Sequence, residues 1–156
     1  MTAQLNQLLA DTMTLRDLYK KSHWQVGGAD VLPFAFAFRQ ALRRASGTGR
    51  LDRRADTLLG GISIAMAHDV AEMTRIERPP RGREAVPVQL SRLLDAHQVI
   101  IGQVRKLARR AGELGDDGTN DLVVSEVLRR NELQAWFLSE HLVDAPLVHA
   151  EPVYAK

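Results

Sequence analysis

The sequence predicts an all-α protein, a bundle of long helices with one short helix among them. Two observations carry this prediction. Apolar residues recur at steps of three and four along most of the chain, which is the spacing of an amphipathic helix. No run of alternating β-branched residues lies between turn residues, so no strand is predicted. Long helices joined by short loops are typical of a helix bundle.

Length and composition limit the class of protein. The chain has 156 residues, no cysteine and a net charge of +2, and we expect one domain over residues 1–156. The lack of cysteine excludes a disulfide framework and a thiolate metal site. No apolar run approaches the length of a membrane span, and the first residues, MTAQLNQLLADTM, lack the pattern of a signal peptide. We therefore expect a cytoplasmic protein without a membrane partner.

The first helix is predicted over residues 4–26. Gly27-Gly28 is expected to end it, because glycine is favoured just past the end of a helix. Its apolar face is formed by Leu5, Leu8, Leu9, Thr12, Leu15, Tyr19, His23 and Val26.

Three further helices follow the same spacing. A short one is predicted over 62–73, before the connection RIERPPRGREAVP, in which Arg81 and Arg83 are expected to be solvated. The two long ones are predicted over 88–113 and 119–142. Their apolar faces are formed by Leu90, Leu93, Leu94, His97, Ile100, Ile101, Val104 and Leu107, and by Leu122, Val123, Val127, Leu133, Trp136, Phe137 and Leu142.

The second helix is expected over 33–59, and its sequence differs from the rest of the chain. Residues 31–57 hold six arginines and two aspartates, so this segment carries +4 and the remainder −2. Pro33 suits a first helical turn. The run Ser46-Gly47-Thr48-Gly49 places two glycines in the interior, and each costs about 1 kcal/mol relative to alanine. We expect the helix to break there, leaving helices over 33–45 and 50–59.

The flanking segments resemble the Dps family, the ferritin-like DNA-binding proteins of starved cells. The resemblance rests on LNQLLADTMTLRDLYKKSHWQVGG, LLGGISIAMAHDVAE, RPPRG and DDGTNDLVVSEVLRRNELQAWFLSEHL, and its most specific part is the Lys-x-x-His-Trp run from Lys20 to Trp24. It implies a ferritin-like four-helix bundle with a short extra helix between the second and third. It also implies a hollow shell of twelve subunits, oxidation of ferrous iron by peroxide, iron storage and often DNA protection.

The resemblance also implies an iron site at a two-fold interface, with five ligands from the first two helices. His23 matches the first ligand. The other four, a histidine, two aspartates and a glutamate, fall by ungapped counting on Ala35, Arg39, Arg50 and Arg54. None of these can bind ferrous iron, which prefers carboxylate and imidazole ligands. Three guanidinium groups would repel the cation, so the ferroxidase site is predicted to be lost from the sequence as it stands.

A shift of reading frame accounts for the arginines. Residues 31–57, back-translated with permitted codon choices and read one base later, become FYPLHLLFDKHYEEQAELVDSIAERIQ. This string is an acidic amphipathic helix with histidine at position 35, aspartate at 39 and 50, and glutamate at 54. Every arginine codon has G in its middle position, so a one-base slip makes an acidic codon available. We infer a compensated frameshift, with slips near Asp30 and Thr57, either in the gene or in the recorded sequence.

The remaining candidate residues have structural alternatives. His23 alone on an apolar face would be structural, and only the His-Trp context favours a metal ligand. Trp24 and Trp136 are interpreted as core or interface aromatics, with radical quenching near iron as a secondary role. The acidic residues Asp116, Asp117 and Asp121 either cap the last helix or line an iron-entry pore at a three-fold axis, which the family has near that end. No role is assigned to His68, His97, His141 and His149.

Three functions remain open at this stage. The first is a Dps-type iron-sequestering mini-ferritin. The second is a non-enzymatic shell or DNA-compacting subunit, and the third is a product of a damaged gene that does not assemble. DNA binding has weak support, because the residues before Leu5 hold no lysine and the C-terminal HAEPVYAK carries one. A phosphate-binding protein needs several accessible cations.

Overall fold

The computed structural model describes residues 1–25, 57, 59–64 and 66–143. All secondary structure in these ranges is helical, as predicted. The predicted second helix, with its break at Ser46–Gly49, falls almost entirely outside them. The helices are α1 (Thr2–Gln25), α3 (Ala67–Met73), α4 (Val86–Glu113), and a last helical rod made of α5 (Asp117–Asp121), the π-helix η1 (Leu122–Leu128) and α6 (Arg129–Glu140).

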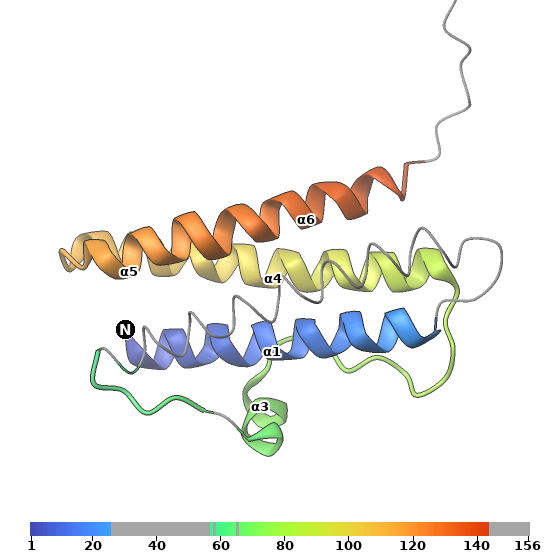
Figure 1. Ribbon diagram of the computed structural model, residues 1–156, viewed down its shortest axis with the longest axis horizontal. Coiled ribbons are helices and arrows are strands. Elements are labelled where there is room, and N and C mark those ends of the chain that lie inside the picture. The colour runs from blue at the N-terminus through green and yellow to red at the C-terminus, as the bar shows by residue number, and fades with distance from the viewer. Residues whose placement is uncertain (26–56, 58, 65, 144–156) are drawn as a thin grey trace, which may run out of the picture.

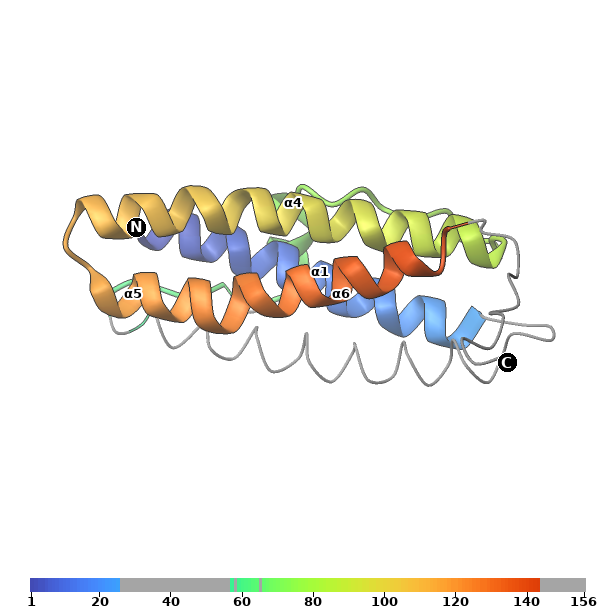
Figure 2. The same ribbon diagram turned by 90° about the horizontal axis from the view of Figure 1, so that it is seen from above.

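The long helices lie side by side with their axes roughly aligned (Figure 1, Figure 2). α4 runs antiparallel to both α1 and α6 and contacts both of them. α3 packs against the outer side of α1 (Figure 1). In the described part of the chain α1, α4 and the last rod therefore surround a common core, and α3 lies outside it.

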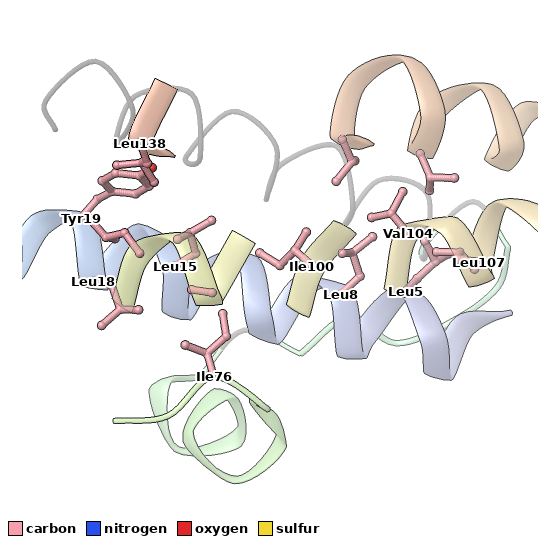
Figure 3. Packing of buried hydrophobic residues seen from close by; sticks show 14 of the residues in the cluster. Leu5, Leu8, Leu15, Leu18, Tyr19, Ile76, Ile100, Val104, Leu107 and Leu138 are labelled. Atoms are coloured by element: carbon pink, nitrogen blue, oxygen red, sulfur yellow. The ribbon is translucent and has the colours of Figure 1, made fainter. Parts of the chain in front are cut away.

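The core forms where the predicted apolar faces of α1, α4 and the last rod meet. Figure 3 shows Leu5, Leu8, Val104 and Leu107 gathered toward one end of the bundle, with Tyr19 beside Leu138 at the other. Burying one such leucine side chain stabilises the fold by about 1.5–3 kcal/mol. The fully or nearly fully buried hydrophobic residues of this cluster include Leu5, Leu8, Leu15, Tyr19, Leu90, Leu93, Ile100, Val104, Leu107, Val123 and Val127.

The ends of α4 follow from local sequence. Pro87 stands in the first turn, where its missing N–H removes no helical hydrogen bond. Gly115 has a φ of +69°, a left-handed conformation that favours glycine, and the helix ends just before it. The observed bounds of α1 and α4 lie within two residues of the predicted ones, 4–26 and 88–113.

The prediction of a helix over 62–73 is wrong in its first part, because α3 begins only at Ala67. The side chain of Asn6 on α1 holds the preceding backbone in a non-helical path. Asn6 Nδ2 donates to the carbonyl of Ile62 (3.0 Å), and the N–H of Ile64 donates to Asn6 Oδ1 (2.9 Å). Ile62 is 90% exposed, so its apolar character does not signal a buried helical face in the single chain.

Asp11 joins three parts of the fold although it lies on a face predicted to be apolar. Its side chain is fully buried. Oδ1 accepts hydrogen bonds from Thr74 Oγ1 (3.0 Å) and the Arg75 N–H (2.7 Å), and Oδ2 accepts from the side-chain amides of Gln7 and Gln103. Four donors satisfy the carboxylate, as a buried charge requires. The bonds connect α1 with α4 and with the chain just past α3.

We expect Asp11→Asn to lower the free energy of unfolding by about 3 kcal/mol, because a buried amide would direct its own N–H groups at some of these donors and leave them unsatisfied. Denaturant unfolding followed by circular dichroism measures this change. The matched control is Asp95→Asn on the exposed surface of α4, which should change stability by no more than about 0.5 kcal/mol. Equal effects of the two substitutions would contradict the role given to Asp11.

Candidate functional site

His23 lies on the last turn of α1 and is half-buried. Its Nδ1 is shielded from solvent and has no hydrogen-bond partner among the described residues. An imidazole nitrogen with a free lone pair is a common metal ligand, so His23 keeps a donor atom available for a cation. The positions of the other four family ligands, Ala35, Arg39, Arg50 and Arg54, lie outside the described residues.

Trp24 and Trp136 are not core residues of the single chain. Trp24 is 70% exposed and Trp136 is 58% exposed. The Lys20 ammonium group lies 4.8 Å from the centroid of the Trp24 ring, a cation–π contact on the surface of α1. The core interpretation is therefore wrong for both tryptophans, and their interface interpretation stays a prediction.

Of the three acidic residues at the start of the last rod, Asp116 caps the helix as predicted, whereas Asp121 lies at the end of α5 and makes no cap hydrogen bond. Asp116 Oδ1 accepts a hydrogen bond from the Thr119 N–H (3.0 Å), and hydrogen bonding to Thr119 lowers the pKa of Asp116. Asp121 Oδ1 accepts from Ser125 Oγ (2.7 Å), and Asp117 is exposed in the first turn of α5. Within the described ranges, no three histidine or acidic side chains are close enough together to hold a metal ion.

Three of the unassigned histidines are described, and two of them are at the surface. His68 pairs with Glu72 at 3.0 Å with both side chains exposed. His141 Nδ1 lies 2.7 Å from the carbonyl oxygen of Phe137. The third, His97 on α4, is buried, as its place on the apolar face predicted. His149 lies outside the described residues.

His97 is at the centre of a buried hydrogen-bond network that the sequence did not reveal. Its Nδ1 lies 2.8 Å from Asn131 Oδ1, and its Nε2 lies 2.6 Å from the Tyr19 hydroxyl. The same hydroxyl is 3.1 Å from Gln134 Oε1. The network joins α1, α4 and α6 through polar atoms in the core.

The orientation of Asn131 sets the tautomer of His97. Asn131 Nδ2 donates to the carbonyl of Val127 (2.8 Å), so Oδ1 is the atom that faces the imidazole. A carbonyl oxygen only accepts, so His97 Nδ1 must carry the proton. Burial lowers the pKa of His97 to about 4, and the ring is therefore neutral near pH 7. Its Nε2 is then an acceptor, so the single proton of the Tyr19 hydroxyl faces two acceptors, His97 Nε2 at 2.6 Å and Gln134 Oε1 at 3.1 Å.

The π-helix η1 aligns the last rod with the core. The buried residues of the rod recur at steps of four: Thr119, Val123, Val127, Asn131 and Ala135. In an α-helix each such step exceeds a full turn by about 40°, so four steps would drift by about 160°. A π-helix holds more residues per turn and reduces this drift. The seven residues of η1 thus keep Asn131 on the face that meets His97.

The comparisons with known proteins agree with this architecture. The family model of the ferritin-like domain matches residues 2–148, which defines the chain as a ferritin-like protein. The fold matches DpsC from Streptomyces coelicolor with a TM-score of 0.92 and 48% identity, over 95% of this chain and 86% of that one. The chain belongs to the Dps family, as the resemblance predicted.

Two sequence relatives extend the comparison. A nutrient stress-induced DNA-binding protein of Nostoc sp. is 30% identical over 142 residues, which cover 90% of this chain and 76% of the relative. An uncharacterized protein of Kitasatospora aureofaciens is 40% identical over 114 residues, or 72% of this chain and 75% of that protein. No helix of the described ranges is long and apolar enough to cross a membrane.

The lowered pKa of His97 predicts a pH dependence of stability. Between about pH 6.5 and 4 the unfolded chain binds a proton that the folded chain does not, so the free energy of unfolding should fall as the pH falls through this window. The decrease in the free energy of unfolding that His97 causes should approach about 3 kcal/mol at the acid end of this window. Denaturant unfolding at several pH values should show a shallower acid loss for His97→Gln than for the parent chain.

His68→Gln provides the control for this measurement, because His68 is exposed and outside the core. It should leave the pH profile of the parent almost unchanged. Parallel profiles for the parent chain and His97→Gln would show that His97 does not stay neutral in the folded protein.

Proposed function

We propose that this chain is a Dps-type mini-ferritin subunit that takes ferrous iron as its cargo and stores it in a shell formed with copies of itself. Membership of the Dps family supports the iron-storage role. The observation that carries the proposal is His23, which matches the family's first ligand position in the sequence and keeps a shielded Nδ1 without a hydrogen-bond partner among the described residues.

The ferroxidase activity itself is proposed to be mostly lost. Oxidation of ferrous iron by peroxide needs anionic and imidazole ligands that hold the metal and stabilise the ferric product. The present chain has alanine at one of the other four positions and Arg39, Arg50 and Arg54 at the rest. These guanidinium groups cannot coordinate iron and would raise the energy of a bound cation. Asp116, Asp117 and Asp121 remain candidates for an iron-entry pore, which fits their position at one end of the rod.

A second candidate function is a non-enzymatic shell or DNA-compacting subunit that protects DNA from oxidative damage by binding it. The name of the Nostoc relative, a DNA-binding protein, favours this candidate. A third possibility is a product of a frameshifted gene that does not assemble. Sequencing the coding DNA across codons 29–58 would separate the intact mini-ferritin from the other two.

The proposal predicts no peroxide-dependent iron oxidation above the uncatalysed rate by the present chain. A reframed chain, with FYPLHLLFDKHYEEQAELVDSIAERIQ over residues 31–57, should oxidise iron, because it restores the four missing ligands together and changes the segment from +4 to −4. Stopped-flow absorbance after mixing ferrous iron with peroxide measures both rates.

His23→Ala is the control in both chains. It should lower the rate of the reframed chain and leave the present chain unchanged at the background rate. If the present chain oxidises iron as fast as the reframed one, and His23→Ala does not slow it, the site has been placed wrongly.

Assembly is predicted to be weaker than in the reframed chain. The family's two-fold interface would bring Arg39, Arg50 and Arg54 toward one another, and buried charges without partners cost several kcal/mol each. Size-exclusion chromatography with light scattering at moderate salt should show a smaller fraction of dodecamer for the present chain. An equally stable dodecamer would show that these arginines have found partners.

A further inference from the structure

A pocket of about 750 Å³ lies on the outer side of α1, where α3 and the connection after it face the helix. Its lining includes the apolar residues Leu18 of α1, Val70 of α3 and Ile76 of the connection, which are 5%, 7% and 6% exposed. The volume falls in the range of small-molecule sites. The pocket therefore offers an apolar floor that the iron chemistry does not use.

The walls of this pocket are held by hydrogen bonds and proline rings. Gln7 Nε2 donates to the carbonyl of Met73 (2.7 Å), and the carboxylate of Asp11 accepts from the Arg75 N–H. These bonds fasten the end of α3 and the start of the connection to α1. Pro79-Pro80, which also lines the pocket, restricts the backbone further. A pocket formed before binding reduces the ordering cost of taking up a ligand.

The charged residues that line the pocket are four cations, Arg16, Lys21, Arg78 and Arg81, and one carboxylate, Asp17. Arg16 pairs with Asp17 at 2.8 Å, and Lys21 lies 3.9 Å from a Glu84 oxygen. Arg78 and Arg81 are exposed and make no hydrogen bond or ion pair with any other described residue. Two cationic residues that line the pocket thus remain available for an anion.

We propose that this pocket binds an amphiphilic anion, a carboxylate or phosphate group on a short apolar chain or ring. The apolar part would cover Leu18, Val70 and Ile76, and the anionic group would accept charge-assisted hydrogen bonds from Arg78 and Arg81. A free phosphate ion would leave the apolar floor unused. A nucleic-acid backbone would likewise present charge without an apolar group to fill the cavity.

The test is calorimetric titration of the full chain, in the assembly state it adopts, with octyl phosphate below its micellar concentration. The expected result is saturable binding of one molecule per subunit. Inorganic phosphate, which lacks the chain, and 1-octanol, which lacks the charge, should each bind at least about tenfold more weakly, because each keeps only one of the two interactions.

Two variants test the location of the site. The double substitution Arg78→Gln and Arg81→Gln should weaken octyl phosphate binding about tenfold or more. Ala71→Trp, at an exposed position of α3 that lines the pocket, should block it by filling the cavity. The matched control, Lys106→Gln with Arg109→Gln, removes two exposed charges from α4 outside the pocket and should leave binding unchanged.

Circular dichroism of each variant shows whether it is folded, and the arginine variant decides the question if Ala71→Trp does not fold. The proposal is overturned if octyl phosphate shows no saturable binding, if inorganic phosphate binds equally well, or if the control loses as much affinity as the arginine variant. None of these outcomes depends on iron oxidation, so they leave the proposed mini-ferritin role to its own test.

Discussion

The described bundle depends on α4, because this helix is covered on two sides. It contacts α1 on one side and the last helical rod on the other. A helix in this position must bury more than one narrow apolar stripe. α4 does so with Leu90, Leu93, Ile100, Val104 and Leu107, all 2% exposed or less. The other described helices lie where their own apolar side chains can pack against these residues of α4.

Two buried polar groups show different ways of satisfying the same constraint. His97 stays neutral, and its two ring nitrogens take partners from α1 and α6. The carboxylate of Asp11 is surrounded by four donors from α1, α4 and the chain past α3. Both groups link elements distant in sequence, and both would be costly if a partner were removed. They therefore fix the relative positions of the helices more specifically than apolar packing alone would.

The sequence predicted α1 and α4 well because both are long segments with regular apolar spacing, and such segments are the easiest to assign as helices. It missed the late start of α3, since two hydrogen bonds from Asn6, more than fifty residues away, override the local apolar pattern. The hydrogen-bond partners of His97 could not be predicted either, because no residue near it in the sequence indicates that it contacts Tyr19 or Asn131. The π-helix η1 was not predicted either, because the polar residues Thr119 and Asn131 of its buried face are known to be buried only from the structure.

The chemistry that the family implies depends on a short part of this chain. Four of the five implied ligand positions fall within positions 31–57, where the sequence has arginine and alanine in place of carboxylate and imidazole. The described core is formed by the apolar faces of α1, α4 and the last rod, and these keep the regular spacing of amphipathic helices. Family membership therefore predicts the scaffold of the described residues more securely than the oxidation chemistry, and His23 is the one implied ligand position whose residue matches.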